Sequence, residues 1–227
     1  MAGEPHITTV IVAAGSGSRF GGDMPKQFRA LAGRPLLMHT VDAFRAALPD
    51  SDIVLVLSAD ATDLWYSLCR AAGFVSPRVV TGGDSRWRSV KNALESIEST
   101  DIVLVHDGAR PLVDAATIHA VIKGVRESGT AVPVVPVTDS LRRADTDQAV
   151  DRSPFRAVQT PQGFDYALLN EAYSRPYRPE FTDDASVVES IGHRIAMTEG
   201  SPCNIKVTYP MDIAVAEAIM AVSDKER

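Results

Sequence analysis

Apolar runs separated by amphipathic segments constrain the fold of this chain more than any other feature of its sequence. The runs are continuous and do not alternate with polar residues, which is typical of strands that are covered on both faces. They lie at Ile7–Ala13, Ile53–Leu57, Arg78–Val80, Ile102–Val105 and Ala131–Val137. The segments between them have the helical period and predict helices at about Leu36–Leu48, Thr62–Ala72, Ser85–Ile97 and Ala115–Glu127. This alternation predicts an α/β fold in which a mostly parallel sheet is flanked by helices.

The pattern changes after Val137, where the sequence becomes polar and weakly periodic. The stretch from about residue 137 to residue 156 predicts a small protruding β-arm on a single domain that spans residues 1–227. Beyond the arm, helical patterns return near Tyr166–Tyr173, Asp184–Ser190 and Asp212–Val222. Short extended runs are expected at His193–Met197 and Ile205–Thr208.

Composition is that of an ordinary soluble globular protein, because 45% of the 227 residues are hydrophobic and 23% are charged. The apolar stretches are too short for a membrane helix, and the chain start lacks the features of a secretory signal, so a cytoplasmic protein without a membrane partner is expected. Cys69 and Cys203 are too few for a disulfide framework and are expected to be reduced and inert. The net charge of -6 argues against a nucleic-acid partner, so any polyanionic ligand needs local positive charge.

A glycine-containing segment follows the first apolar run and reads Ala13-Ala14-Gly15-Ser16-Gly17-Ser18-Arg19-Phe20. Glycine can take positive φ and lets the backbone approach a ligand, with its N–H groups turned toward phosphate oxygens. Arg19 and Lys26 supply charge. A dinucleotide-binding motif needs a third glycine where Phe20 stands, and the chain has no Gly-Lys-Ser/Thr of a Walker loop. The segment therefore predicts a cradle for a nucleoside triphosphate; the plainer alternative is a glycine turn beside two solvated cations.

An acidic residue, Asp107, stands just past the end of a predicted buried strand. Mg²⁺ is held in such places by one or two carboxylates together with ligand phosphates. The alternative is an aspartate that caps the turn and pairs with Arg110. His106 is expected to pack or to form hydrogen bonds rather than to act as a catalyst.

Two glycines, Gly82 and Gly83, end another predicted strand, and a nucleotide base fits against such a backbone. Asp84 and Ser89 are then expected to contact the base or the sugar, although Asp84 is equally suited to cap the following helix. Arg86 and Arg88 form either a solvated helix face or a phosphate clamp.

A lone lysine, Lys206, stands between Ile205 and Val207 and on a strand would point opposite to both. It faces either a phosphate site or water. The segment from Thr182 to Ser186 resembles an N-capped helix start. The chain has no nucleophile elbow and no His-Glu-x-x-His helix, so its chemistry is expected to depend on positioning and charge neutralisation.

Six segments in this order resemble the 2-C-methyl-D-erythritol 4-phosphate cytidylyltransferase family over nearly the whole chain. They are the glycine loop with Arg19 and Pro25-Lys26, the segment Gly82 to Ser89, Val105 to Arg110, Thr160-Pro161-Gln162, Thr182 to Ser186, and Asn204 to Thr208. The resemblance implies a Rossmann-like core of the nucleotidyltransferase type and a homodimer joined by the arm. It also implies Mg²⁺, CTP and a cytosolic place in the non-mevalonate route to isoprenoid precursors.

The residues of both substrate sites follow from this resemblance. For CTP, it and the glycine loop imply Ala13, Ala14, Gly15, Gly17, Gly83, Asp84, Ser89 and Gly108. Asp107 is implied on the metal, and Arg19, Lys26 and Lys206 are implied on the phosphates as the catalytic set. For the sugar phosphate, the resemblance implies Asp107, Arg110, Thr160, Thr182 and Lys206, with Ser140 and Arg152 from the partner's arm. Two positions depart from the family pattern: Ser140 keeps the hydroxyl of the commoner threonine, and Gly108 keeps the backbone N–H of the commoner alanine.

The implied reaction is attack by the methylerythritol phosphate oxygen on the α-phosphorus of CTP, which gives CDP-methylerythritol and pyrophosphate. Three other functions stay open at this point. A ribitol 5-phosphate cytidylyltransferase would use an acceptor of similar charge, and a non-catalytic nucleotide-binding regulator would use the arm for assembly. A dinucleotide-dependent oxidoreductase is disfavoured by Phe20.

Overall fold

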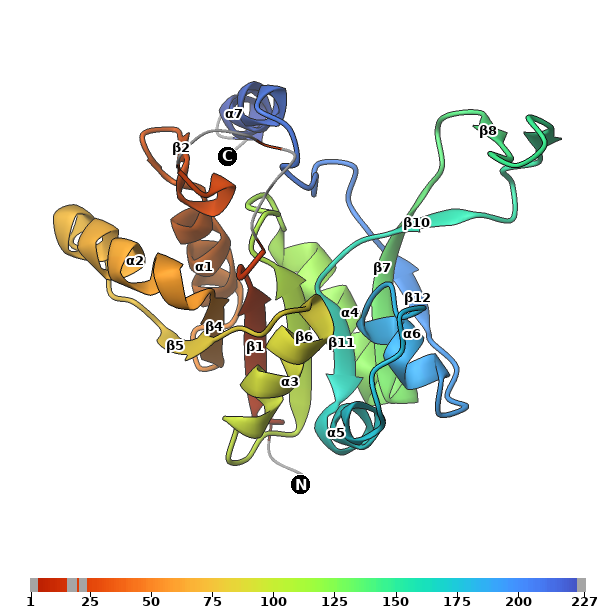
Figure 1. The fold of residues 1–227 in the computed structure, drawn as a ribbon, viewed down its shortest axis with the longest axis horizontal. Coiled ribbons are helices and arrows are strands. Elements are labelled where there is room, and N and C mark those ends of the chain that lie inside the picture. Colours follow the sequence, from red (N-terminus) through yellow and green to blue (C-terminus); the bar gives the residue numbers. More distant parts are fainter. Residues whose placement is uncertain (1–3, 16–19, 21–23, 224–227) are drawn as a thin grey trace.

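The structure is a computed structural model that describes residues 4–15, 20 and 24–223. Its centre is an eight-stranded sheet in which the strands run in the order β10-β7-β11-β6-β1-β4-β5, with β12 paired to β7 (Figure 1). The strands are β1 (Ile7–Val12), β4 (Asp52–Leu57), β5 (Arg78–Thr81), β6 (Ile102–Asp107), β7 (Thr130–Pro136), β10 (Arg156–Val158), β11 (Gln162–Asp165) and β12 (Met197–Glu199). The neighbours β5, β4, β1 and β6 are parallel, whereas β11 is antiparallel to β6 and β7. The predicted mostly parallel sheet is therefore confirmed.

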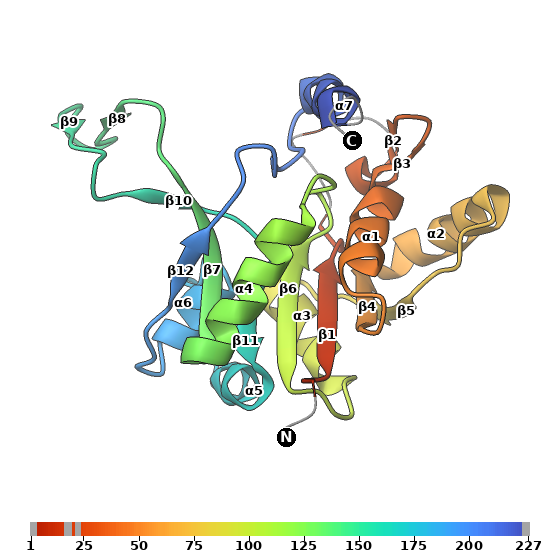
Figure 2. The same cartoon turned by 180° about the vertical axis from the view of Figure 1, so that it is seen from behind.

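Helices cover both faces of this sheet (Figures 1 and 2). One layer contains α3 (Arg86–Glu95), α5 (Tyr166–Ser174) and α6 (Asp184–Glu189), and the other contains α1 (Leu36–Ala47), α2 (Ala59–Ala72) and α4 (Ala115–Ser128). Successive strand residues point to opposite layers, so that Val10 packs with the first layer and Ile11 with the second. Because both layers are apolar, the strands carry apolar residues at every position, which explains the continuous runs in the sequence.

Smaller elements complete the edge of the sheet at which the parallel strands end. They are η1 (Lys26–Phe28), β2 (Ala30–Leu31), β3 (Arg34–Pro35) and the C-terminal helix α7 (Met211–Ser223). Leu31, Leu36, Val207 and Ala216 form a separate buried cluster that packs α7 against the β2–β3 hairpin. In the part of the chain that the structure describes, no helix is both long and apolar enough to cross a membrane.

The predicted arm is a hairpin that projects from the body, formed by β8 (Leu141–Arg142) and β9 (Ala149–Val150) (Figure 1). Its residues are polar and mostly exposed, since nothing else in the described chain packs over the tip. This agreement concerns the shape of the arm alone, and its role in assembly stays a prediction.

Several strand assignments differ from the sequence-based expectations, and β2, β3, β10 and β11 were not predicted. β11 was not predicted, because its residues Gln162 and Gly163 are not apolar, although both are buried. The strand expected at His193–Met197 is β12 at Met197–Glu199, which pairs with β7. The run at 205–208 is not a strand, because no strand in the described part of the chain pairs with it. The N–H of Val207 donates instead to the carbonyl of Ala109, at 2.8 Å.

Gly163 on β11 supplies a stability test, because α4 packs directly over it. A Cβ at this position would lie 2.5 Å from Cγ1 of Val121 and 2.8 Å from Cγ2 of Val125. Since overpacking a close-packed core typically costs about 1–3 kcal/mol, we expect Gly163→Ala to lower the free energy of unfolding in urea by that amount. Gly15→Ala is the matched control, since a Cβ there meets no atom within 4 Å. Equal effects of the two substitutions would contradict this packing argument.

Candidate active site

A cavity of about 470 Å³ opens at the carboxyl ends of β1, β5 and β6. Parallel α/β sheets bind ligands at this edge, because the loops that leave neighbouring strands converge there. The structure brings most of the sequence-predicted residues into its lining, namely Ala13, Ala14, Gly15, Lys26, Gly83, Asp84, Ser89, Asp107, Gly108 and Lys206. Sequence analysis missed Val12, Gln27, Ser85 and Ala109 and left the role of Arg86 open; all five also line the cavity.

The loops after β1 and β5 touch each other, and this contact requires a glycine. A Cβ on Gly82 would lie 2.4 Å from Cβ of Ala14 and 2.9 Å from Oγ of Ser89. The hydroxyl of Ser89 accepts the N–H of Gly83 at 3.1 Å and so fixes the turn. The φ angle of Gly15 is not in the left-handed region. A Cβ at this position would meet no described atom within 4 Å. The close approach of a ligand to Gly15 stays a prediction.

Asp107 lies at the centre of a group of cations. Its Oδ2 is 2.9 Å from Nζ of Lys206 and 3.4 Å from Nε of Arg110, and its Oδ1 is 3.9 Å from Nε of Arg86. Burial by itself raises the pKa of Asp107, but the charges of Arg86, Lys206 and Arg110 outweigh it and hold the pKa well below its usual range. The carboxylate is therefore an anion throughout the physiological pH range.

The two predicted lysines reach the cavity from different elements. Lys26 begins η1, and its Nζ donates to the carbonyl of Val207 at 3.0 Å. Next to that carbonyl, Lys206 sends its side chain to Asp107 while Val207 is buried in the opposite direction. The expected alternation of side chains is thus present although the segment is no strand. The question left open by the sequence is answered for Lys206, which faces Asp107 in the cavity.

Arg86, which the sequence left as part of either a solvated helix face or a phosphate clamp, lines the cavity and takes a carboxylate partner. Its guanidinium makes a bidentate ion pair with Asp184, at 2.9 and 2.6 Å. Burial lowers the pKa of Arg86, but the adjacent Asp184 more than compensates and raises the pKa above its ordinary value. The helix that Arg86 begins is capped by Ser85, whose Oγ accepts the N–H of Arg88 at 3.1 Å. Of the two interpretations left open for Asp84, capping of α3 is therefore excluded, and Asp84 lies in the cavity lining.

His106 is buried and serves the structure of the site, as expected from the sequence. Its Nε2 lies 3.1 Å from the carbonyl of Arg110, which can only accept, so Nε2 carries the proton. Nδ1 then accepts the hydroxyl proton of Thr160 at 3.0 Å, and the same hydroxyl accepts the N–H of Asp107 at 3.0 Å. Desolvation lowers the pKa of His106 to about 4. The imidazole is neutral and fully engaged, so it is not available as a general acid or base.

The remaining predicted residues lie at different distances from the cavity. Arg110 sits behind Asp107 and donates to the carbonyl of Asn204 at 2.8 Å. Thr182 is exposed just before α6, whose predicted N-cap is confirmed because Asp183 accepts the N–H of Ser186 at 2.9 Å. The single chain does not bring Ser140 and Arg152 to the cavity, since both are exposed on the arm, and Arg19 and Gly17 fall outside the described residues.

The N–H of Gly108 forms a hydrogen bond to β1. It donates to the carbonyl of Val12 at 2.9 Å, so the backbone N–H that Gly108 shares with the commoner alanine is already engaged within the protein. A Cβ at this position would lie 2.9 Å from Cβ of Ala13. Gly108 therefore serves the close packing of the loops after β1 and β6, and any contact with a nucleotide must use its Cα or carbonyl.

The donor set of the cavity fits Mg²⁺ when that ion arrives with a phosphate ligand. Among the described residues, no group of three or more His, Cys, Asp or Glu side chains is placed to hold a metal ion by itself. Mg²⁺ commonly needs only one or two carboxylates, the rest of its shell coming from water and substrate phosphates. Asp107, ionised and next to open space, meets that requirement.

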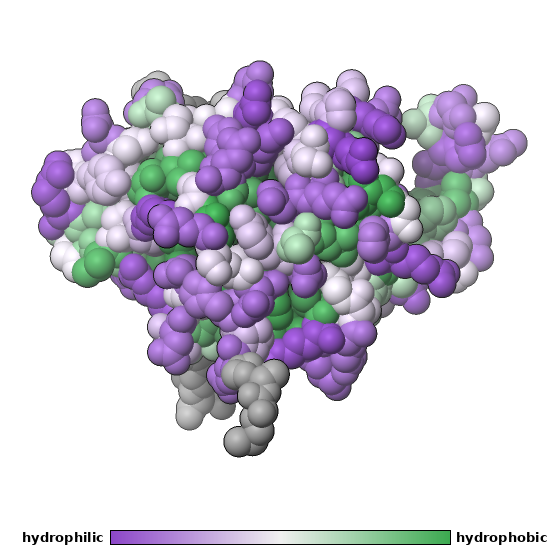
Figure 3. Space-filling view, turned by 90° about the horizontal axis from the view of Figure 1, so that it is seen from below, coloured by the Kyte–Doolittle hydropathy of each residue, from purple (hydrophilic) through white to green (hydrophobic). Residues whose placement is uncertain are grey.

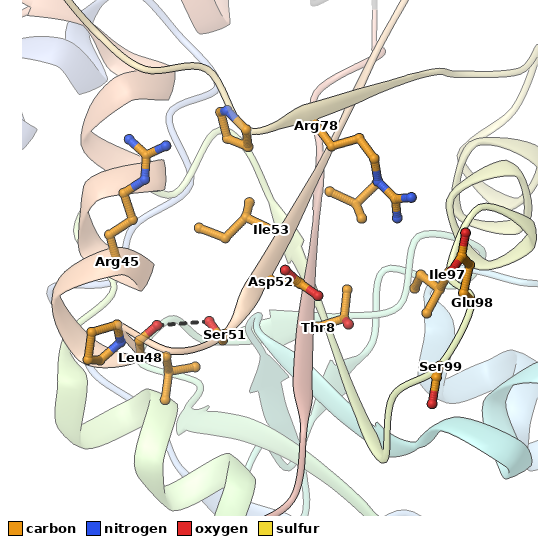
Figure 4. Close-up of a pocket in the computed structure, with 13 residues that line it drawn as sticks. Thr8, Arg45, Leu48, Ser51, Asp52, Ile53, Arg78, Ile97, Glu98 and Ser99 are labelled. Carbon is orange, nitrogen blue, oxygen red and sulfur yellow. Dashed lines mark hydrogen bonds between the residues drawn. The ribbon is translucent and has the colours of Figure 1, made fainter.

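A second cavity, of about 650 Å³, lies at the amino ends of β4 and β5 (Figure 4). Arg45 and Arg78 lie on opposite sides of it, and each already donates to a backbone carbonyl, of Val75 at 2.6 Å and of Ser96 at 2.8 Å. Viewed from below, the molecule shows a largely hydrophilic surface with scattered apolar residues (Figure 3). The described lining of this cavity includes no glycine loop and none of the residues that the sequence predicted for the site.

Comparisons with known proteins agree on one family. The family model described as 2-C-methyl-D-erythritol 4-phosphate cytidylyltransferase matches residues 7–222. The protein of that name from Porphyromonas gingivalis is 47% identical over 222 residues, which are 96% of this chain and 99% of the relative. Its namesake from Bacillus cytotoxicus is 39% identical, covering 95% and 98%. The crystal structure of the enzyme of that name from Thermus thermophilus superposes with a TM-score of 0.77 at 36% identity, covering 95% and 99%.

The neutral state of His106 generates a prediction about acid stability. The unfolded chain protonates this imidazole below about pH 6.5, whereas the folded chain does so only near pH 4, where the pKa of His106 lies. Its contribution to folding is therefore complete above pH 6.5 and is lost as the pH falls toward 4, by roughly 3 kcal/mol. We expect a His106→Gln variant to lose less unfolding free energy between pH 7 and pH 4.5 than the wild type, in urea titrations. His119→Gln, on the exposed side of α4, is the control, and an unchanged pH dependence in His106→Gln would refute the assignment.

Proposed function

The chain belongs to the 2-C-methyl-D-erythritol 4-phosphate cytidylyltransferase family, and we propose that its reaction takes place in the cavity at the carboxyl edge of the sheet. The enzyme is a nucleotidyltransferase that converts this sugar phosphate and CTP to CDP-methylerythritol and pyrophosphate. The assignment of the site depends on the group of cations around Asp107. Arg110 follows β6, Arg86 begins α3, and Lys206 lies in the segment before α7.

The acceptor needs no general base from the protein. A phosphate monoester has a second pKa of about 6, so its oxygen is already a dianionic nucleophile at neutral pH. That oxygen forms a bond to the α-phosphorus of CTP, and the bond from the α-phosphorus to the bridging oxygen breaks, which releases pyrophosphate. The proposal agrees with a site in which the buried imidazole, His106, is neutral and has both nitrogens engaged.

The main barrier is electrostatic, because two polyanions must meet and charge grows on the leaving group. Lys26 and Lys206 are proposed to neutralise the phosphate oxygens, with Arg19 as a third cation from outside the described residues. Preorganised cations in a partly desolvated site act strongly because they need no reorganisation during the reaction. Mg²⁺ on Asp107 would supply further charge neutralisation of the triphosphate. Lys206 and Asp107 hold each other in place, with Nζ 2.9 Å from Oδ2.

The base of CTP is proposed to lie toward the loop after β5, against Gly83 and Asp84, with Ser89 supporting the turn. This arrangement is supported by the shared cavity lining and by the hydrogen bond from Gly83 to Ser89. The acceptor is proposed to enter from the other side, near Arg110, Thr160 and Thr182. Of these, Thr160 donates its hydroxyl hydrogen bond to Nδ1 of His106, so toward the sugar phosphate this hydroxyl can only accept a hydrogen bond.

A homodimer is proposed in which each arm completes the site of the other chain. The supporting observations are that Ser140 and Arg152 are exposed on a projecting hairpin and do not line the cavity of their own chain. We also propose a cytoplasmic location, in keeping with the substrates of the non-mevalonate route. Sedimentation equilibrium at micromolar concentration tests the assembly, and the mass of a single chain would contradict it.

The function is tested by a substrate panel of four nucleoside triphosphates against methylerythritol phosphate and ribitol 5-phosphate, with Mg²⁺ and pyrophosphate detection. Pyrophosphate is expected from CTP with methylerythritol phosphate. Turnover with ribitol 5-phosphate instead would change the assigned acceptor, and CTP binding without pyrophosphate release would point to a regulator.

Removal of either lysine is expected to slow the chemical step. Lys26→Ala and Lys206→Ala should each lower kcat by about 10² to 10³, roughly 3–4 kcal/mol of transition-state stabilisation. The dissociation constant of CTP, measured by calorimetry, should change less, because the cations act most strongly on the charge that develops during transfer. Lys123→Ala, at an exposed position on α4, is the matched control. Unchanged turnover in either active-site variant would contradict the assigned roles.

A further inference from the structure

Arg86 joins two carboxylates that belong to different elements. Its Nη1 and Nη2 donate to the two oxygens of Asp184 at 2.9 and 2.6 Å, and its Nε lies 3.9 Å from Oδ1 of Asp107. Arg86 is the first residue of α3, Asp107 ends β6, and Asp184 begins α6. A bidentate guanidinium fixes direction as well as distance, so one side chain sets the relative position of these three elements.

Asp184 is arranged to hold that guanidinium in one orientation. It is fully buried, and its Oδ1 also accepts the hydroxyl of Tyr173 at 2.6 Å. The ring of Trp87 stacks on Tyr173 with centroids 5.6 Å apart, which restricts the tyrosine in turn. A buried ion pair contributes little net stability compared with an apolar core of the same shape. The presence of such a pair beside the active site therefore calls for a role other than stability.

The start of α6 is held in place by side-chain contacts from other elements. The helix has only six residues, too few to be stable by itself. Gln162 of β11 holds it from one side, since its Nε2 donates to Asp183 at 2.8 Å and its Oε1 accepts the N–H of Ala185 at 2.9 Å. Arg86 holds it from the side that faces the cavity. Thr182 directly precedes α6, so the contacts of Gln162 and Arg86 also fix its position.

We propose that Arg86 is a positioning residue that keeps the acceptor side of the site, at Thr182 and α6, in register with Asp107. This inference rests on the proposed function and assigns Arg86 a task within it. The nucleotide side depends on the loops after β1 and β5, which are fixed by their own contacts at Gly82 and Ser89. Loss of Arg86 should therefore affect the acceptor far more than CTP.

The test is Arg86→Gln, compared with Arg126→Gln on α4, where the side chain is exposed. Misplacement of a reactant by about 1 Å can slow a reaction about 10²-fold. We expect kcat/KM for methylerythritol phosphate to fall about 10- to 100-fold in Arg86→Gln, with a higher KM and a lower kcat. The dissociation constant of CTP, from calorimetry, should change less than about threefold, and Arg126→Gln should match the wild type in both measurements.

A double variant separates positioning from stability. Arg86→Gln alone leaves Asp184 buried and unpaired, which lowers Tm. Adding Asp184→Asn removes the buried charge and should restore much of Tm while kcat/KM for the acceptor stays low. Recovery of kcat/KM together with Tm would overturn the proposal, as would an acceptor kcat/KM that Arg86→Gln leaves unchanged.

Arg86→Lys allows the proposal to be tested if the Arg86→Gln variant does not fold. Lysine supplies one point charge and cannot form the two-pronged contact, so the acceptor defect is expected in a protein of near wild-type Tm. Wild-type kinetics in Arg86→Lys would overturn the proposal. If the panel shows that the wild-type enzyme uses another polyol phosphate, the proposed acceptor is wrong, and the ratio of Arg86→Gln to wild type on that acceptor still decides this inference.

Discussion

The carboxylate of Asp107, held among Lys206, Arg110 and Arg86, is the contact on which the rest of the site depends. Each of the three cations comes from a different part of the chain, and all converge on the last residue of a buried central strand. Opposite charges brought together in a partly desolvated place interact more strongly than they would in water. The carboxylate thereby holds side chains that would otherwise repel one another, in the place where a polyanion is to bind.

Local concentration of charge resolves an apparent conflict in the composition. The chain carries a net charge of -6, which by itself would repel two phosphate-bearing substrates. The described lining of the cavity nevertheless gathers Lys26, Arg86 and Lys206 against one buried acid, Asp107, and one exposed acid, Asp84. Fixed charges at short range outweigh the screened charge of the remaining surface, because screening acts over about 8–10 Å in physiological salt. A protein of net negative charge can therefore catalyse a reaction between two anions.

The sequence predicted elements wherever apolar periodicity carried the information. Continuous runs such as Ile102–Val105 became strands with a helix layer on each face, and the amphipathic stripe of α4 became a buried helix face. Where pairing rests on buried polar groups the prediction failed, as at β11, because Gln162 is buried by its bonds to α6 and not by its hydrophobicity. The run at Ile205–Thr208 failed for the converse reason: its apolar alternation is genuine, but no neighbouring strand lies beside it in the described chain.

By itself, the sequence determined the α/β layers and the glycine-containing edge, because these follow from local spacing and from side-chain chemistry, whereas most of the residues expected to meet at that edge came from the family resemblance. Only the tertiary structure decided which partner each charged or polar group takes. Arg86 finds Asp184 across 98 positions of the chain, and the N–H of Gly108 goes to Val12 and not to a ligand. Such pairings depend on how strands and helices are placed relative to one another. The short-range pattern of the sequence does not specify that placement.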